Sequence, residues 1–249
     1  MAEAERWQLN DFALRCFRYT ADHDYVSARL AFRARTYGTF QWLGLHALEK
    51  YLKCILLLHR VKATNVRHSL GKAVAKLAEV ERPTIEFSDE VRATMAYFDQ
   101  VGPYRYLEVS HHLDGRKLTE LDRAVWEVRR YCRVFLFDVH LTEGMSWGEL
   151  AEAEIEQAAE APHAYRIQSG ELERILDGED SFQRRALIWY NSYFGTRSRK
   201  RVTFRFTRYE NAPLFNYPDL VDEAAKYVFI PKHLIEGYRT LAKGELPGS

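Results

Sequence analysis

The apolar residues between positions 39 and 59 recur with the period of an α-helix, and no other feature of this chain constrains its fold as strongly. They fall at i, i+3, i+4 and i+7 and therefore share one face of a helix. The stripe consists of Leu45, Leu48, Leu52, Ile55 and Leu56. Because a helix gains most of its stability by packing such a face against other elements, the stripe predicts the central helix of a bundle.

Further helices are expected on both sides of this central one. The predicted ranges are 9–20, 25–37 with a turn at Gly38, 69–80, a helix that Ser88 opens and Gly102 ends, and 119–141. The last begins with Thr119-x-x-Asp122, which is similar to a capping box. The fold class is therefore mainly α, with an up-down bundle of four or five helices in residues 1–145. Residues 104–112 show no clear helical or strand pattern.

Composition changes abruptly after the bundle. Residues 143–180 contain 11 acidic and 2 basic residues, whereas residues 181–209 contain 8 basic residues and no acid. We expect an acidic helix and linker at 146–180, with a solvated helix near 149–160. A mostly helical C-terminal module is expected at 181–249, where a first helix ends at Gly195. The alternation in RKRVTFRFTRY predicts that this module carries one short extended or hairpin arm.

Charge and motif content limit the functional classes. The net charge is +1, which gives no general attraction to nucleic acid or anionic membranes. No phosphate loop, dinucleotide fingerprint, nucleophile elbow or metal-ligand spacing occurs, so we expect no cofactor and no metal. Cys16, Cys54 and Cys132 are interpreted as reduced packing residues of a cytoplasmic protein. The longest apolar run, 54–58, is far too short for a membrane span, and the first residues are not typical of a signal peptide.

The central helix also carries charges that a bundle core does not need. Glu49 and Lys53 have the spacing of an intrahelical ion pair on a solvated face. In the alternative interpretation, His46, Lys50 and Lys53 form a stripe that binds phosphate, with Glu49 holding one lysine. His68 opens the next predicted helix and is either a cap or a contact to the same ligand. Glu49, Lys50, Lys53 and His68 are therefore candidate ligand-binding residues.

The first 140 residues resemble the HEPN family, whose name denotes nucleotide binding in higher eukaryotes and prokaryotes. The resemblance is carried, in order, by Asp24-Tyr25, Gly38-x-Phe40, ALEKYLK at 47–53, His68-Ser69-Leu70 and Tyr104-Arg105-Tyr106. This chain departs from the family pattern at Ser69, where aspartate is usual, and at Leu107, where proline is common. The resemblance covers a little over half of the chain and leaves the C-terminal hundred residues outside.

The resemblance implies a helical bundle that is usually a homodimer. Some members are RNA-cleaving toxins with a nucleotidyltransferase-like antitoxin partner, and others are thought to bind nucleotides. Catalytic members carry an arginine and a histidine with four to six residues between them, which Arg105 matches with His111 (five between) or His112 (six between). On a continuous helix His112 would lie within about 20° of Arg105. The histidine would act as acid or base without a metal, and the arginine would stabilise charge on phosphorus.

The alternative is that this segment is a loop without catalytic geometry, because Gly102-Pro103 and Asp114-Gly115 bracket it. Tyr104 remains a candidate ligand contact through the Tyr-x-Tyr motif.

The basic arm interleaves arginines with aromatic residues, a composition that fits contact with single-stranded RNA. Its candidate nucleic-acid-binding residues are Arg197, Arg199, Lys200, Arg201 and Arg205. In the competing interpretation the arm binds the acidic segment of its own chain. We expect a HEPN-like protein that binds nucleotide or RNA, in a defence or toxin–antitoxin context. The alternatives are a metal-independent endoribonuclease and a non-catalytic dimerisation module.

Overall fold

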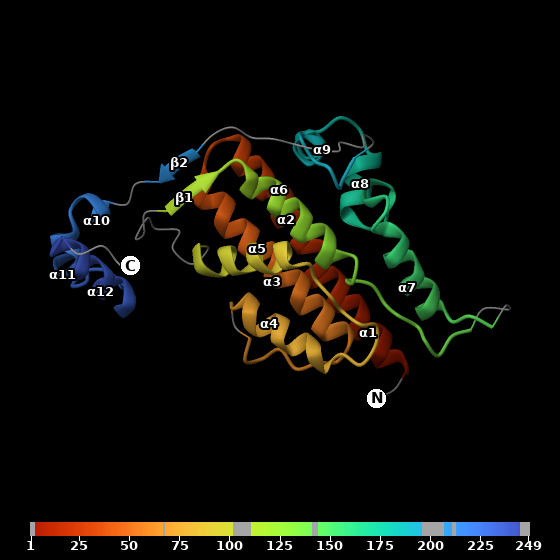
Figure 1. Cartoon of the computed structure of the whole chain (residues 1–249). Helices are drawn as coiled ribbons and strands as arrows, with labels where there is room; N and C mark the ends of the chain where they lie inside the picture. Colours follow the sequence, from red (N-terminus) through yellow and green to blue (C-terminus); the bar gives the residue numbers. More distant parts are fainter. Residues whose placement is uncertain are drawn as a thin grey trace.

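The protein is mainly helical, as the apolar periodicity predicts (Figure 1). The computed structural model describes residues 3–66, 68–101, 111–140, 144–195, 207–210 and 213–244. Helices α2, α3, α5 and α6 form the bundle, and α7, α8 and α9 lie along one side of it (Figure 1). A two-stranded ribbon and a small C-terminal group of helices lie on the other side.

The chain begins with one long continuous helical segment. Helix α1 (Glu3–Ala13) runs into the π-helical segment η1 (Leu14–Tyr19), which runs into α2 (Thr20–Arg33). The prediction of separate helices at 9–20 and 25–37 is therefore wrong. No glycine or proline interrupts this region, and the Thr20 hydroxyl donates to the Cys16 carbonyl oxygen at 2.7 Å. The π-helical turn falls within the first predicted helix, and residues 21–24, which separated the two predicted helices, lie in the first turns of α2.

Helix α3 (Tyr37–Leu58) is the centre of the bundle. Its predicted stripe is confirmed, since the five aliphatic side chains that define it are fully buried. Gly38 lies in the first turn of α3 and not in the preceding turn, where Arg35 takes a left-handed φ of 62°. Gly44 permits close packing of α5, because a Cβ atom there would lie 2.4 Å from Cε1 of Phe98.

The next helices complete the bundle. They are α4 (Leu70–Lys76) with the 3₁₀ turn η2 (Leu77–Glu79), α5 (Asp89–Val101) and α6 (Arg116–Arg129). Helix α6 begins before Thr119, because the Asp114 carboxylate accepts from the Arg116 amide at 2.8 Å. Thr119 and Asp122 lie inside the helix and form no capping box. The helix also ends at Arg129, well before the predicted residue 141.

The acidic segment packs on the bundle. It contains α7 (Trp147–Ala158), the 3₁₀ turn η4 (Pro162–Ala164) and α8 (Glu171–Asp177), and α9 (Phe182–Ile188) follows. Ser146 and Glu149 form a capping box at the start of α7. Ala151, Ile155, Leu172 and Leu187 join the apolar cluster of the bundle. The apolar core therefore extends past residues 145 and 180, the two positions at which the composition of the sequence changes. One face of α7 is buried rather than solvated, and α9 ends before Gly195.

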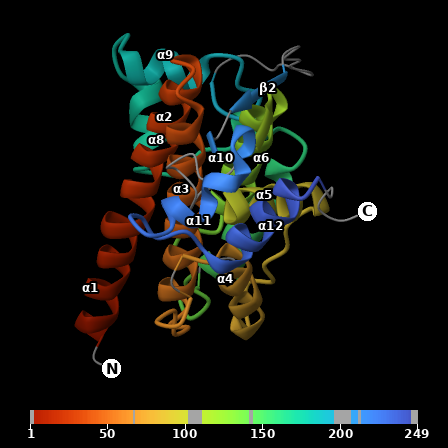
Figure 2. The ribbon, with the colours of Figure 1, turned by 90° about the vertical axis from the view of Figure 1, so that its left-hand side faces the viewer.

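A short antiparallel ribbon joins the segment before α6 to the end of the basic arm. Strand β1 (His111–Asp114) pairs with β2 (Thr207–Glu210), so the end of the predicted arm is extended. Beyond it lie α10 (Pro213–Asn216), η5 (Pro218–Leu220), α11 (Val221–Ala224) and α12 (Lys232–Ala242). These helices share a small core of Leu214, Val221, Ile230 and Tyr238. Figure 2 views the molecule from their side.

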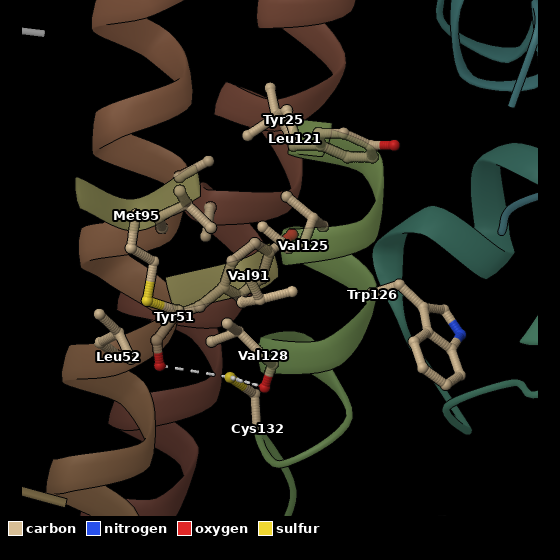
Figure 3. Close-up of a cluster of buried hydrophobic side chains, with 14 of the residues drawn as sticks. Tyr25, Tyr51, Leu52, Val91, Met95, Leu121, Val125, Trp126, Val128 and Cys132 are labelled. Atoms are coloured by element: carbon tan, nitrogen blue, oxygen red, sulfur yellow. Dashed lines mark hydrogen bonds between the residues drawn. The ribbon is translucent and has the colours of Figure 1, made fainter. Parts of the chain in front are cut away.

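The main core lies between α3, α5 and α6 (Figure 3). Leu52, Met95 and Val128 meet there, and the Cys132 thiol contacts the Tyr51 carbonyl oxygen at 3.3 Å. Burial raises the pKa of the Cys132 thiol well above its ordinary value. Cys54 and Cys132 are free and buried, and Cys16 is free and exposed, so none is in a disulfide. In the part of the chain that the structure describes, no helix is both long and apolar enough to cross a membrane.

His59, which caps the end of α3, makes stability depend on pH. Its Nε2 atom is buried without a hydrogen-bond partner among the described residues. Burial, with a smaller contribution from Arg60, lowers the pKa of His59 to about 4. The unfolded chain therefore binds a proton that the folded chain rejects between pH 6.5 and 4, and stability falls as the pH falls through this window.

We predict that His59→Phe, which keeps a ring against Phe135, flattens this dependence. On going to pH 5 the wild type should lose up to roughly 2 kcal/mol more of its free energy of unfolding than the variant, at about 1.4 kcal/mol per pH unit below pH 6.5. Urea unfolding of both proteins at pH 7.5 and pH 5 measures this difference. The other titrating groups are common to both proteins, so their effects cancel in the comparison. Parallel pH profiles of the two proteins would show that His59 is not the titrating group.

Candidate nucleic-acid interface

Two buried ion pairs fix α2 against α6, and the candidate interface is built on this frame. Helix α2 supplies Asp22 and Arg29, and α6 supplies Asp122 and Arg129, each pair seven residues apart. The Arg129 Nε atom donates to Asp22 at 2.7 Å, and Arg29 donates to Asp122. All four side chains are at most 3% exposed. The reciprocal pairing fixes the helices in an antiparallel arrangement.

The same arginines hold the segment that follows the bundle. Arg129 makes two hydrogen bonds to Glu173 of α8, at 2.8 and 2.7 Å. Burial alone would lower the pKa of Arg129, but Asp22 and Glu173 hold it well above its ordinary value. The Arg29 Nε atom donates to the Ala186 carbonyl oxygen of α9 at 2.8 Å. The bundle and α8–α9 therefore form one hydrogen-bonded unit.

Our sequence reasoning missed this network. Its signal was present, because Asp22, Tyr25 and Arg29 occupy i, i+3 and i+7 on the apolar face of their helix, as do Asp122, Val125 and Arg129 on theirs. Charged residues at such positions are expected to be buried and paired.

The charged cluster on α3 is internally neutralised. Lys53 Nζ donates to Glu49 at 2.5 Å, and His68 Nδ1 lies 3.1 Å from the other Glu49 oxygen. Lys50 Nζ donates to Asp24 of α2 at 2.5 Å. The structure thus brings Glu49, Lys53 and His68 together and places Lys50 in a separate pair. Two lysines opposed by two carboxylates offer little net charge to a phosphate, which favours a structural role.

His46 and the start of α4 fit the same conclusion. The His46 ring lies 4.0 Å from the Trp42 ring, and burial lowers the pKa of His46, so it is neutral near pH 7. At the start of α4, the Asp99 carboxylate accepts from the Leu70 amide at 3.0 Å and the Gly71 amide at 3.2 Å. The position where a helix N-terminus would attract a phosphate is therefore filled by the protein's own acid.

The ribbon joins two segments that the sequence singles out separately. In its register His111 pairs with Glu210, His112 with Tyr209 and Leu113 with Arg208. The two histidines lie in a strand, so the helical spacing that favoured His112 over His111 does not apply to them. The end of the arginine-rich arm lies beside the strand that carries them.

The remaining candidates lie outside the described residues. They are Tyr104 and Arg105 before the ribbon, and Arg197, Arg199, Lys200, Arg201 and Arg205 of the arm.

The acidic segment already has basic partners in the described part of the chain. Arg82 contacts Glu149 and Glu152, Arg133 contacts Glu154, and Arg166 contacts Asp177. Glu173 is paired with Arg129, as described above. These pairs occupy several of the carboxylates that the competing interpretation assigned to the basic arm. Among the described residues, no group of three or more His, Cys, Asp or Glu side chains could hold a metal ion.

We predict that Asp122→Asn lowers the free energy of unfolding by about 3–5 kcal/mol, because it leaves the Arg29 charge buried without a counter-charge. Asp138→Asn is the matched control, since Asp138 pairs with Arg6 at the exposed surface. Urea unfolding of both variants measures the effect. Equal midpoints for the two variants would mean that the buried pair does not fix the fold.

Comparison with known proteins gives no relative from which a role could be transferred. No family model matches the sequence, and no match is found among curated proteins or among solved structures.

Proposed function

We propose that this protein binds single-stranded RNA through the β1–β2 ribbon and the basic segment 197–206 that leads into β2. The observation that carries the proposal is the antiparallel ladder between His111–Asp114 and Thr207–Glu210. It places the end of the most basic part of the sequence beside the segment that follows Tyr104-Arg105-Tyr106. Both segments were candidates for RNA contact on independent grounds.

Charge and composition support the proposal. Arginines neutralise phosphates and stack on unpaired bases, and interleaved aromatic residues provide further stacking surfaces. The two lysines on α3 are neutralised by their own acids. The arm is the most basic segment of the sequence, and several acids of the preceding acidic segment are paired with other arginines.

The HEPN resemblance supports the same class of ligand. Its motifs are distributed over the bundle, with Asp24-Tyr25 on α2, residues 47–53 on α3 and His68 immediately before Ser69, the N-cap of α4. We extend the proposal to a HEPN-like bundle that acts as a homodimer in a defence or toxin–antitoxin context, with a nucleotidyltransferase-like antitoxin as its partner.

A second candidate function is metal-independent RNA cleavage by Arg105 with His111 or His112. The ribbon favours it over other enzyme classes, because RNA held on the arm would pass close to the backbone of both histidines. Histidine could transfer protons near neutral pH, and Arg105 would stabilise the charge that develops on phosphorus.

We predict that a triple variant, Arg199→Gln, Arg201→Gln and Arg205→Gln, binds a single-stranded RNA 20-mer at least about tenfold more weakly. Losing three phosphate contacts should also reduce the slope of log affinity against log salt concentration by about 2. Fluorescence anisotropy between 50 and 300 mM salt measures both quantities.

The control removes the same charge from exposed arginines elsewhere, with Arg15→Gln, Arg185→Gln and Arg239→Gln. This variant should bind RNA with nearly the affinity of wild type. If both triple variants lose affinity equally, binding reflects overall charge and the proposed interface is incorrect.

For RNA binding without cleavage, wild type, His111→Ala and His112→Ala should all leave mixed transfer and messenger RNA intact over hours at pH 7.5. Gel analysis in the presence of EDTA detects products and removes metal-dependent contaminants. Cleavage by wild type that disappears in either histidine variant would establish the second candidate instead.

A further inference from the structure

A cavity of about 770 Å³ lies between η1, the loop after α6, α7 and the loop that leads to α8. This volume falls in the range of small-molecule sites, about 300–1,000 Å³. Its charged lining comes from Arg18, Arg133, Arg166 and Glu154, and its aromatic lining from Trp147 and Tyr165. None of these residues belongs to the ribbon or the arm.

The π-helical segment shapes one wall of the cavity. Extended π-helical turns are rare, and those that occur are frequently found at functional sites. Leu14 and Arg18 of this segment both line the cavity. The Arg18 Nη1 atom donates to the Cys132 carbonyl oxygen at 3.0 Å, which ties its guanidinium group to the loop after α6.

The cavity has an excess of positive charge. Three arginines line it against one acid, Glu154. Arg133 Nη1 donates to Glu154 at 2.7 Å and to the Tyr165 hydroxyl at 3.1 Å, and Arg166 pairs with Asp177 at the surface. Within the described part of the chain, Arg18 makes no ion pair with a carboxylate. The lining therefore offers guanidinium groups whose donors are not all used by the protein.

The geometry points to a binding site for a small organic phosphate that carries a planar ring, of the size of a mononucleotide. Several guanidinium groups suit a phosphate, which has three or more acceptor oxygens and more than one charge, better than a single carboxylate. Trp147, which is 49% exposed, and Tyr165 provide faces on which a ring can stack. This site goes beyond the proposed RNA interface and does not depend on it.

Glu154 opposes such a ligand in two ways. Its charge repels phosphate, and it occupies one donor of Arg133. Glu154→Gln should therefore tighten binding. If Glu154 had a purely structural role, the same substitution would weaken binding or leave it unchanged. Glu156 is exposed on the same helix and does not line the cavity, so Glu156→Gln is the matched control.

Calorimetry and tryptophan fluorescence with AMP, UMP and ATP test the proposal, with adenosine and inorganic phosphate as partial ligands. We expect the nucleotides to bind more tightly than either partial ligand and to quench Trp147, an effect that Trp147→Phe removes. Arg18→Gln and Arg133→Gln should each weaken binding about tenfold or more, as expected for a lost charge-assisted contact. Arg15→Gln, in the same π-helical segment but outside the cavity, should not.

The design also separates this site from the RNA interface. The arm triple variant should keep its mononucleotide affinity, and the cavity variants should keep their RNA affinity. The proposal is overturned if millimolar nucleotide gives no heat and no quenching with folded wild-type protein. It is also overturned if Glu154→Gln, checked for folding by circular dichroism, binds no more tightly than Glu156→Gln.

Discussion

The reciprocal ion pairs between α2 and α6 are the constraint on which the rest of the structure depends. Burying two arginines and two aspartates is costly, and replacing such pairs by apolar residues is often neutral or stabilising, so we infer that they specify geometry rather than add net stability. They fix one relative position of the helices, because any other would leave charges buried without partners. Tyr25 extends the network by donating to Asp122 at 2.7 Å and accepting from Asn191 at 2.9 Å.

This constraint reaches the cavity through Glu173. Besides Arg129, the Glu173 carboxylate accepts from the Ile167 amide at 3.1 Å, in the loop that lines the cavity. The chain passes so close to this pair at Gly170 that a Cβ atom there would lie 1.9 Å from a Glu173 oxygen. The frame that orders the bundle therefore also shapes a site that the sequence patterns did not reveal.

The parts of the fold that the sequence predicts are those determined by local periodicity. The α3 stripe, the start of α4 near residue 69 and the start of α5 after Ser88 depend on neighbouring residues, and the structure has them as predicted. The N-cap of α4 is Ser69, however, and not His68, which was the candidate cap. The predicted start of α6 was wrong because Thr119-x-x-Asp122 has the spacing of a cap. Asp122 instead forms a buried ion pair with Arg29. The β1–β2 register depends on partners distant in the sequence, which periodicity cannot identify.

The candidate site shows the same limit. The spacing of Glu49 and Lys53 predicts their ion pair, but Asp24 as the partner of Lys50 requires the packing of α2 on α3. Composition identifies the arm as basic, while its position beside His111–Asp114 follows only from the ladder. In the cavity, Arg18 has no carboxylate partner among the described residues, whereas Lys50 and Lys53 of α3 each pair with an acid.

Hydrogen–deuterium exchange of the full chain with and without a single-stranded RNA 20-mer tests the central claim most directly. The RNA interface proposed above predicts slower amide exchange in peptides that contain residues 111–114 and 207–210, with unchanged exchange in α3 around residues 47–53. Protection confined to α3 and the start of α4, with none in the ribbon, would contradict the account and return the function to Glu49, Lys53 and His68.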